Sequence, residues 1–166
     1  MNNRAQVIGQ VFIFILAGLI FVLILGYGYK AIMHLLERGE EVQLLDFRNE
    51  LESVINTIKR DYGSVQRVDL RVPAKTETVC MVSSDQEDIT DVQLEQLRQD
   101  YPLIAGAWMT GTENVFLIPR QPTPIRVNDL KVEGGYACLA AINGRVSLRA
   151  EGMGNKAAVS EWQQVR

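Results

Sequence analysis

Apolar residues dominate the first part of the chain, and no charged residue occurs from Ala5 to Tyr29. As an α-helix this stretch would be about 37 Å long, whereas the hydrocarbon core of a bilayer is about 30 Å thick. A cleaved secretory signal has a shorter apolar run, of roughly 7–15 residues, followed by a small-residue cleavage site that is missing here. The pattern therefore predicts one N-terminal hydrophobic helix that can anchor the protein in a membrane.

The helical pattern continues past Tyr29, but apolar side chains become confined to one face. No proline occurs between Lys30 and Tyr62, and apolar residues recur there at heptad spacing. Leu45 and Ile55 should widen this stripe to the breadth that a domain core covers. We therefore predict one helix over residues 6–62, hydrophobic over 6–29 and amphipathic over 30–62. The residues expected to pack this helix on a sheet are Leu44, Phe47, Leu51, Val54 and Ile58.

Local signals mark the end of the helix and its weak points. Lys59 and Arg60, followed by Gly63, are typical of a helix C-terminus. Glycine in a helix interior costs roughly 1 kcal/mol relative to alanine. We therefore expect a bend or a melted turn near residues 26–28 or near residue 39. The glycines concerned are Gly26, Gly28 and Gly39.

Beyond residue 62 the pattern changes to the alternation of strands. Among the predicted strands, a capping box formed by Thr90 and Gln93 predicts the start of a short helix. Asn143-Gly144 between two alternating runs, residues 136–142 and 145–150, predicts a β-hairpin with a type I′ turn. The fold class is thus α+β: a long N-terminal helix packed on an antiparallel β-sheet head formed by residues 63–166. The other predicted strands cover residues 65–72, 76–82, 114–118, 125–132 and 156–162.

The composition offers little catalytic or metal-binding chemistry. The chain has one histidine, two cysteines and a net charge of −3. We therefore predict a protein that is not an enzyme, with no catalytic residues, metal site or cofactor and no nucleic-acid partner. Acidic residues between positions 85 and 91 lack the spacing of a calcium loop and should form a solvated loop. Cys80 and Cys138 lie in predicted strands and form either one disulfide or two buried thiols.

Charges beside the hydrophobic stretch predict its orientation in a membrane. Arg4 and the α-amine precede it without any acid, whereas the basic residues that follow it are diluted by glutamates. Because positive charge accumulates on the cytoplasmic side, the N-terminus should lie in the cytoplasm and the head outside.

The layout of the whole chain, together with Arg4-Ala5-Gln6, resembles type IV pilin-like proteins, with an N-terminus similar to that of archaeal pilins and archaellins. The resemblance implies a leader, residues 1–5, that a prepilin peptidase-type enzyme removes before Gln6; a cut after Gly9 is the competing possibility. It also implies that assembly machinery moves the subunit from the membrane into an extracellular helical homopolymer. The polymer interface would include Gln10, Phe12, Phe14, Leu16, Leu19, Phe21, Leu23 and Leu25.

The same pattern also fits a different class of protein. A helix that is apolar on all sides suits lipid as well as a bundle of helices. The alternative is therefore a single-pass membrane-anchored binding or scaffold module that does not polymerise.

Overall fold

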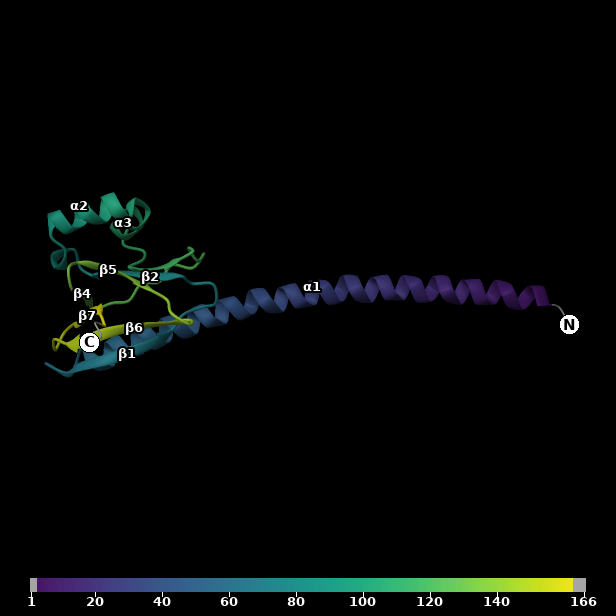
Figure 1. The fold of residues 1–166 in the computed structure, drawn as a ribbon, viewed down its shortest axis with the longest axis horizontal. Helices are drawn as coiled ribbons and strands as arrows, with labels where there is room; N and C mark the ends of the chain where they lie inside the picture. The colour runs from purple at the N-terminus through teal and green to yellow at the C-terminus, as the bar shows by residue number, and fades with distance from the viewer. Residues whose placement is uncertain (1–2, 163–166) are drawn as a thin grey trace. The chain divides into compact units, whose positions relative to one another are not determined.

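The computed structural model describes residues 3–162, and within this range the side chains of residues 12–34 and 39–162. The chain divides into two compact units, residues 1–41 and residues 42–166. The first helix, α1 (Asn3–Ile58), contributes to both. The predicted α+β class is confirmed, because a long N-terminal helix precedes a head made of sheets (Figure 1).

The first unit consists of the N-terminal part of α1. Helix continues without a break through Gly26, Gly28 and Gly39. The prediction of a melted turn at these glycines is therefore wrong. Opening a helix in its interior requires a second nucleation, on the order of 4 kcal/mol, which exceeds the penalty of roughly 1 kcal/mol for each glycine.

The C-terminal part of α1 belongs to the second unit and ends at Ile58, four residues before the predicted boundary at 62. Strand β6 (Arg145–Gly152) passes close to this helix end. A Cβ atom on Gly152 would lie 2.2 Å from the carbonyl oxygens of Ile58 and Asp61. The Gly63 N–H donates to the Gly152 carbonyl at 2.8 Å. Only glycine allows the strand and the helix end to approach so closely.

The described part of the head, up to residue 162, contains two sheets rather than one. The larger has the order β1-β6-β7-β4, and the smaller has the order β3-β2-β5. All pairs are antiparallel except β4–β7, which is parallel. The prediction of one antiparallel sheet therefore misses the parallel β4–β7 pair and the division of the strands into two sheets. The remaining strands are β1 (Val65–Arg71), β2 (Thr78–Val82), β3 (Val115–Ile118), β4 (Leu130–Val132), β5 (Tyr136–Ala140) and β7 (Ala157–Glu161).

The predicted hairpin is correct at its turn and wrong in its strands. Asn143 and Gly144 have φ values of 52° and 70°, so both adopt the left-handed conformation of a type I′ turn. Ile142 and Arg145 pair beside the turn. Beyond this bridge the two strands separate: β5 pairs with β2, whereas β6 pairs with β1 and β7. The predicted strand over 125–132 is likewise shorter, because only Leu130–Val132 form β4.

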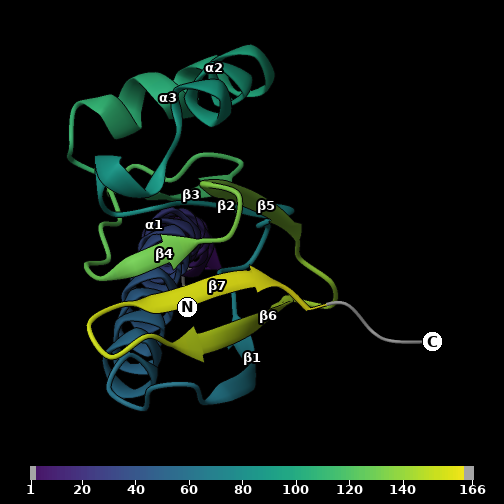
Figure 2. The same ribbon diagram turned by 90° about the vertical axis from the view of Figure 1, so that its left-hand side faces the viewer.

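Two hydrophobic cores hold the head together. The larger core joins the C-terminal part of α1 to both sheets, with Leu51 and Leu148 fully buried. Figure 2 shows this end of the helix with the strands of both sheets around it. The smaller core lies on the other face of the three-stranded sheet, around Trp108 and Leu97.

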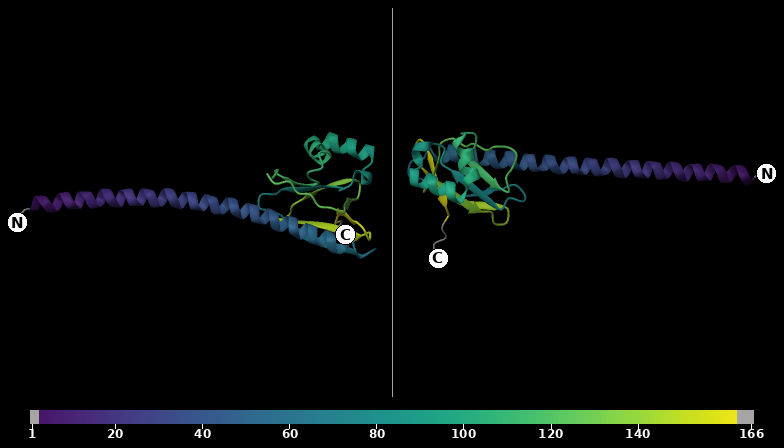
Figure 3. Two further views of the ribbon diagram at one scale, coloured as in Figure 1. Left: turned by 180° about the vertical axis from the view of Figure 1, so that it is seen from behind. Right: turned by 90° about the horizontal axis from the view of Figure 1, so that it is seen from above.

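Two short helices cover that smaller core, α2 (Asp91–Asp100) and α3 (Pro102–Met109). Figure 3 shows from behind the order of α2 and α3, then the sheets, then the end of α1. The capping box predicted at Thr90 and Gln93 is confirmed, since each residue's side chain bonds the other's backbone. The head is therefore a layered domain whose helices and strands bury two separate apolar clusters.

Candidate membrane and assembly surface

The first unit presents an apolar surface on every side of its helix. Every residue from 12 to 34 is exposed, and the exposure of the large apolar ones ranges from Met33 at 43% to Tyr27 at 73%. Among the described residues, one helix is long and apolar enough to cross a membrane, and its most apolar segment is not buried at all. Exposed apolar area costs roughly 25 cal/mol per Å² in water. This surface therefore requires lipid or other apolar helices around it.

The predicted interface residues divide into those that the structure describes and those that it does not. Residues at intervals of three and four fall on one side of a helix, and the remaining positions complete its circumference. Gln10 and the processing residues Arg4, Ala5 and Gln6 lie outside the described side chains. The exposed members of the set are Phe12, Phe14, Leu16, Leu19, Phe21, Leu23 and Leu25.

In the second unit the exposure of α1 becomes one-sided. Leu45 is 53% exposed, although its neighbour Leu44 is 6% exposed. Leu45 points away from the sheets and therefore does not widen the apolar stripe as predicted. Ile55 is buried in the core and does widen it. Val54 is partly buried against the core. The other predicted helix-to-sheet residues, Leu44, Phe47, Leu51 and Ile58, are all buried in the larger core.

Cys80 and Cys138 are joined by a disulfide. They lie directly opposite one another in the β2–β5 pair, with their Cα atoms 3.9 Å apart and an S–S distance of 2.00 Å. Both belong to the smaller core, beneath α2 and α3. Of the two alternatives that the sequence left open, the structure contains the bridge, and it ties the central strand of the small sheet to an edge strand.

The acidic cluster between residues 85 and 91 is solvated at Asp85, Glu87 and Asp91, as predicted, whereas Asp88 is half-buried. Lys156, far away in the sequence, lies 2.7 Å from Asp85 and 2.6 Å from Asp88. Lys131 approaches Asp88 at 3.5 Å. The hydrogen bonds that the Lys156 ammonium donates to the carboxylates of Asp85 and Asp88 raise the pKa of Lys156 above its ordinary value of 10.5. Among the described residues no group of acids, histidines and cysteines could hold a metal ion. The cluster therefore pairs charges between segments of the head that are distant in the sequence.

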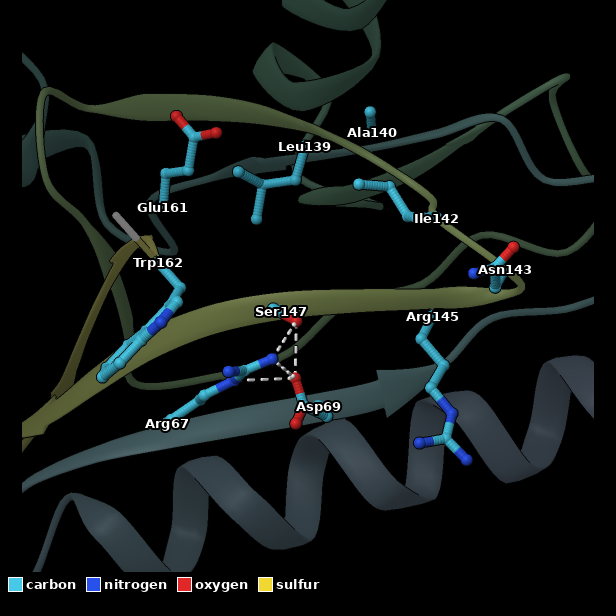
Figure 4. A pocket seen from close by; sticks show the side chains of 10 residues that line it. All are labelled: Arg67, Asp69, Leu139, Ala140, Ile142, Asn143, Arg145, Ser147, Glu161 and Trp162. Carbon is cyan, nitrogen blue, oxygen red and sulfur yellow. Dashed lines mark hydrogen bonds and ion pairs between the residues drawn. The ribbon is translucent and has the colours of Figure 1, made fainter. Parts of the chain in front are cut away.

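A second polar cluster lies on the outer face of β1 and β6, and sequence reasoning missed it. Ser147 and Arg67 both donate hydrogen bonds to the same carboxylate oxygen of Asp69 (Figure 4). The bond from Ser147 is the main cause that lowers the pKa of Asp69 below 3.8, and Arg67 adds to it. Arg67 also lies over the ring of Trp162, 5.6 Å from its centroid. The only local signal was the i, i+2 spacing of Arg67 and Asp69, which places both on one face of a strand.

In comparisons with known proteins, no family model, no curated protein and no solved structure matches this chain.

Proposed function

We propose that this protein is a structural subunit of an extracellular type IV pilus-like filament. The subunit would be held in the membrane by the hydrophobic part of α1, with its N-terminus in the cytoplasm, until assembly. It would then polymerise through the same helix and display the β-rich head for adhesion or another surface interaction. Its partners would be other copies of itself, a prepilin peptidase-type enzyme and assembly machinery.

One observation carries this proposal: the same helix is exposed on all sides over residues 12–34 and buried on one side over residues 44–58. A membrane anchor needs only the first property, and an ordinary core helix needs only the second. A subunit that moves from lipid into a bundle of identical helices needs an all-round apolar segment attached to an independently packed head. The resemblance of Arg4-Ala5-Gln6 to a leader boundary supports the same proposal.

A single-pass anchored module is the competing function, because lipid alone also satisfies the exposed surface. Mass spectrometry of the N-terminus, combined with electron microscopy of filaments sheared from producing cells, separates the two. The filament proposal expects this chain in the filaments, with an N-terminus at Gln6. If the chain keeps Met1, stays in the membrane fraction and occurs in no filament, the anchored module is the correct function.

A further inference from the structure

The outer edge of β5 carries backbone groups that the described residues leave unpaired. β5 lies at the end of its sheet and pairs only with β2. In an antiparallel pair, alternate residues turn their N–H and C=O towards the partner strand. The Ala141 N–H donates to the Glu77 carbonyl at 2.8 Å, and the Ser83 N–H donates to the Gly135 carbonyl at 3.0 Å. Odd-numbered residues therefore face β2, and the residues that turn their backbone groups outward are Tyr136, Cys138 and Ala140.

A second strand edge faces this one across the opening of the hairpin. Arg145 and Ile142 exchange both backbone hydrogen bonds beside the turn, at 2.8 and 3.1 Å. By the same alternation, Ser147 turns its N–H and C=O to this side of β6. The β6–β7 ladder begins only at Leu148. Between the turn and the start of that ladder, two strand edges thus face each other, and no strand of the described residues 3–162 lies between them.

A cleft occupies this space. It has a volume of about 740 Å³, and Figure 4 shows Leu139 and Ile142 on one side with Asp69 and Ser147 on the other. An adjoining hollow of about 450 Å³ continues along β5 as far as Tyr136 and shares Leu139 with the cleft. The open space therefore follows the unpaired edge of β5 along its whole length.

The two ends of this groove carry opposite charges. Arg145 lines the cleft at the turn, and its positive charge contributes to lowering the pKa of the Asp69 carboxyl in the same cleft. Glu161 lines both hollows, and Asp100 lies at the far end, where it accepts a hydrogen bond from the Tyr136 hydroxyl at 2.9 Å. Trp162, with Arg67 on its ring, forms an apolar wall between the two ends.

We propose that this groove binds an extended peptide segment of another polypeptide, which adds to the outer edge of β5 as a further strand. A row of backbone donors and acceptors at every second residue matches a peptide main chain. An acidic side chain of the segment pairs with Arg145, and a basic side chain at the other end pairs with Glu161 and Asp100. Apolar side chains between them lie against Leu139 and Trp162. This inference does not depend on the filament, because any single copy of the head carries the groove.

Two synthetic probes test the inference on the full chain in detergent micelles. The first is an acetylated, amidated heptapeptide of sequence EVTVTVK, and the second, KVTVTVE, presents the charges in the opposite chain direction. In the free protein, the amides of Ala137 and Leu139 should exchange slowly and those of Cys138 and Ala140 quickly. One of the two peptides should bind, measured by calorimetry, and slow the exchange of Cys138 and Ala140 by roughly tenfold or more.

Two controls separate strand addition from simple charge attraction. N-methylation of alternate amides keeps every side chain of the peptide but removes one row of donors, so one of the two methylated isomers should lose binding. Arg145→Glu should weaken binding of the better peptide by roughly tenfold, and the peptide KVTVTVK should restore it. Arg60→Glu, at an exposed position of the same unit and away from the groove, should leave the affinity unchanged.

Three outcomes would overturn the inference. Neither peptide binds at about 1 mM, which corresponds to roughly −4 kcal/mol. Binding survives both N-methylated isomers, so that the main chain is not what the groove recognises. The amides of Cys138 and Ala140 are already protected in the free protein, so that the chain itself covers the edge.

Discussion

The two parts of α1 differ in what surrounds them, although they form one helix. Leu16, in the first part, is 48% exposed, whereas Leu51, in the second, is fully buried. The difference comes from the distribution of apolar residues. Between residues 12 and 25 they occupy all sides, so no single domain face can cover them. Between residues 44 and 58 they recur at heptad spacing, so one face meets the sheets and the other meets water.

This comparison separates the apolar surface that the chain buries within its own head from the apolar surface that only lipid or other helices can bury. Fully burying a large apolar side chain contributes roughly 1.5–3 kcal/mol. The second part of α1 gains this contribution within the head, through Phe47, Leu51 and Ile55. The first part gains it only from lipid or from other helices.

Leu16→Arg should abolish assembly and leave the head folded. A charge in the middle of an apolar helix costs roughly 2.5–3.5 kcal/mol on insertion scales, and it would recur in every subunit of a polymer. Filaments should be absent by electron microscopy, while the disulfide and the thermal unfolding of the head stay unchanged. Ser53→Arg, on the exposed side of the second part, is the matched control and should assemble normally. Normal filaments from Leu16→Arg would remove this helix as the polymer interface.

Replacing both cysteines by alanine should destabilise the head by roughly 4 kcal/mol in the chain-entropy model, because the bridge closes a long loop. The sequence separation of Cys80 and Cys138 is 58 residues. Denaturant unfolding of the full chain in detergent, followed by the fluorescence of Trp108, measures the loss. The helicity of the first unit should not change, since it contributes nothing to the core beneath α2 and α3. A loss of helicity there at low denaturant would contradict the division.

Leu51→Ala should cost roughly 2–5 kcal/mol, because it leaves a cavity between the helix and both sheets. Leu45→Ala removes the same atoms from a side chain on the exposed face of the helix. It should change the free energy of unfolding by less than about 0.5 kcal/mol. The two variants share chemistry and helix propensity, so their difference reports burial alone. Equal losses at the two positions would mean that the helix does not pack as described.

The successes and failures of sequence reasoning follow the range of the interactions involved. The heptad stripe, the Thr90 cap and the Asn143-Gly144 turn were predictable, because neighbours within a few residues determine them. The separation of β5 from β6 was not predictable, because it depends on the pairing of β5 with β2, which lies far away in the sequence. The Cys80–Cys138 bridge remained undecided for the same reason: the register that brings the two cysteines together is a property of the folded sheet.

The polar clusters show the same limit. The ion pair of Asp88 was not predictable, because its partner, Lys156, lies 68 positions later in the chain. The cluster at Asp69 needs Ser147, which the β1–β6 register places directly opposite it. Pairs like these are visible only once the strands have been aligned. The apolar surface of the first unit, by contrast, needs no fold to be recognised.

The smallest expected effect concerns the acid titration of Asp69. It tests whether a change in the first unit alters the electrostatics of the head. Ser147 and Arg67 bond the ionised carboxylate, so its pKa in the folded protein lies below 3.8. The stability that these bonds contribute is present above the unfolded pKa and is lost as the pH falls through the folded pKa. Ser147→Ala removes the main cause and should raise the pKa towards its ordinary value, measured by NMR titration of the Asp69 carboxyl. The titration should be the same in the Leu16→Arg variant as in the unaltered chain, because the cluster lies wholly within the head. A change in the pKa of Asp69 caused by Leu16→Arg would show that the two parts of the molecule are coupled. The separation of roles along α1 would then be wrong.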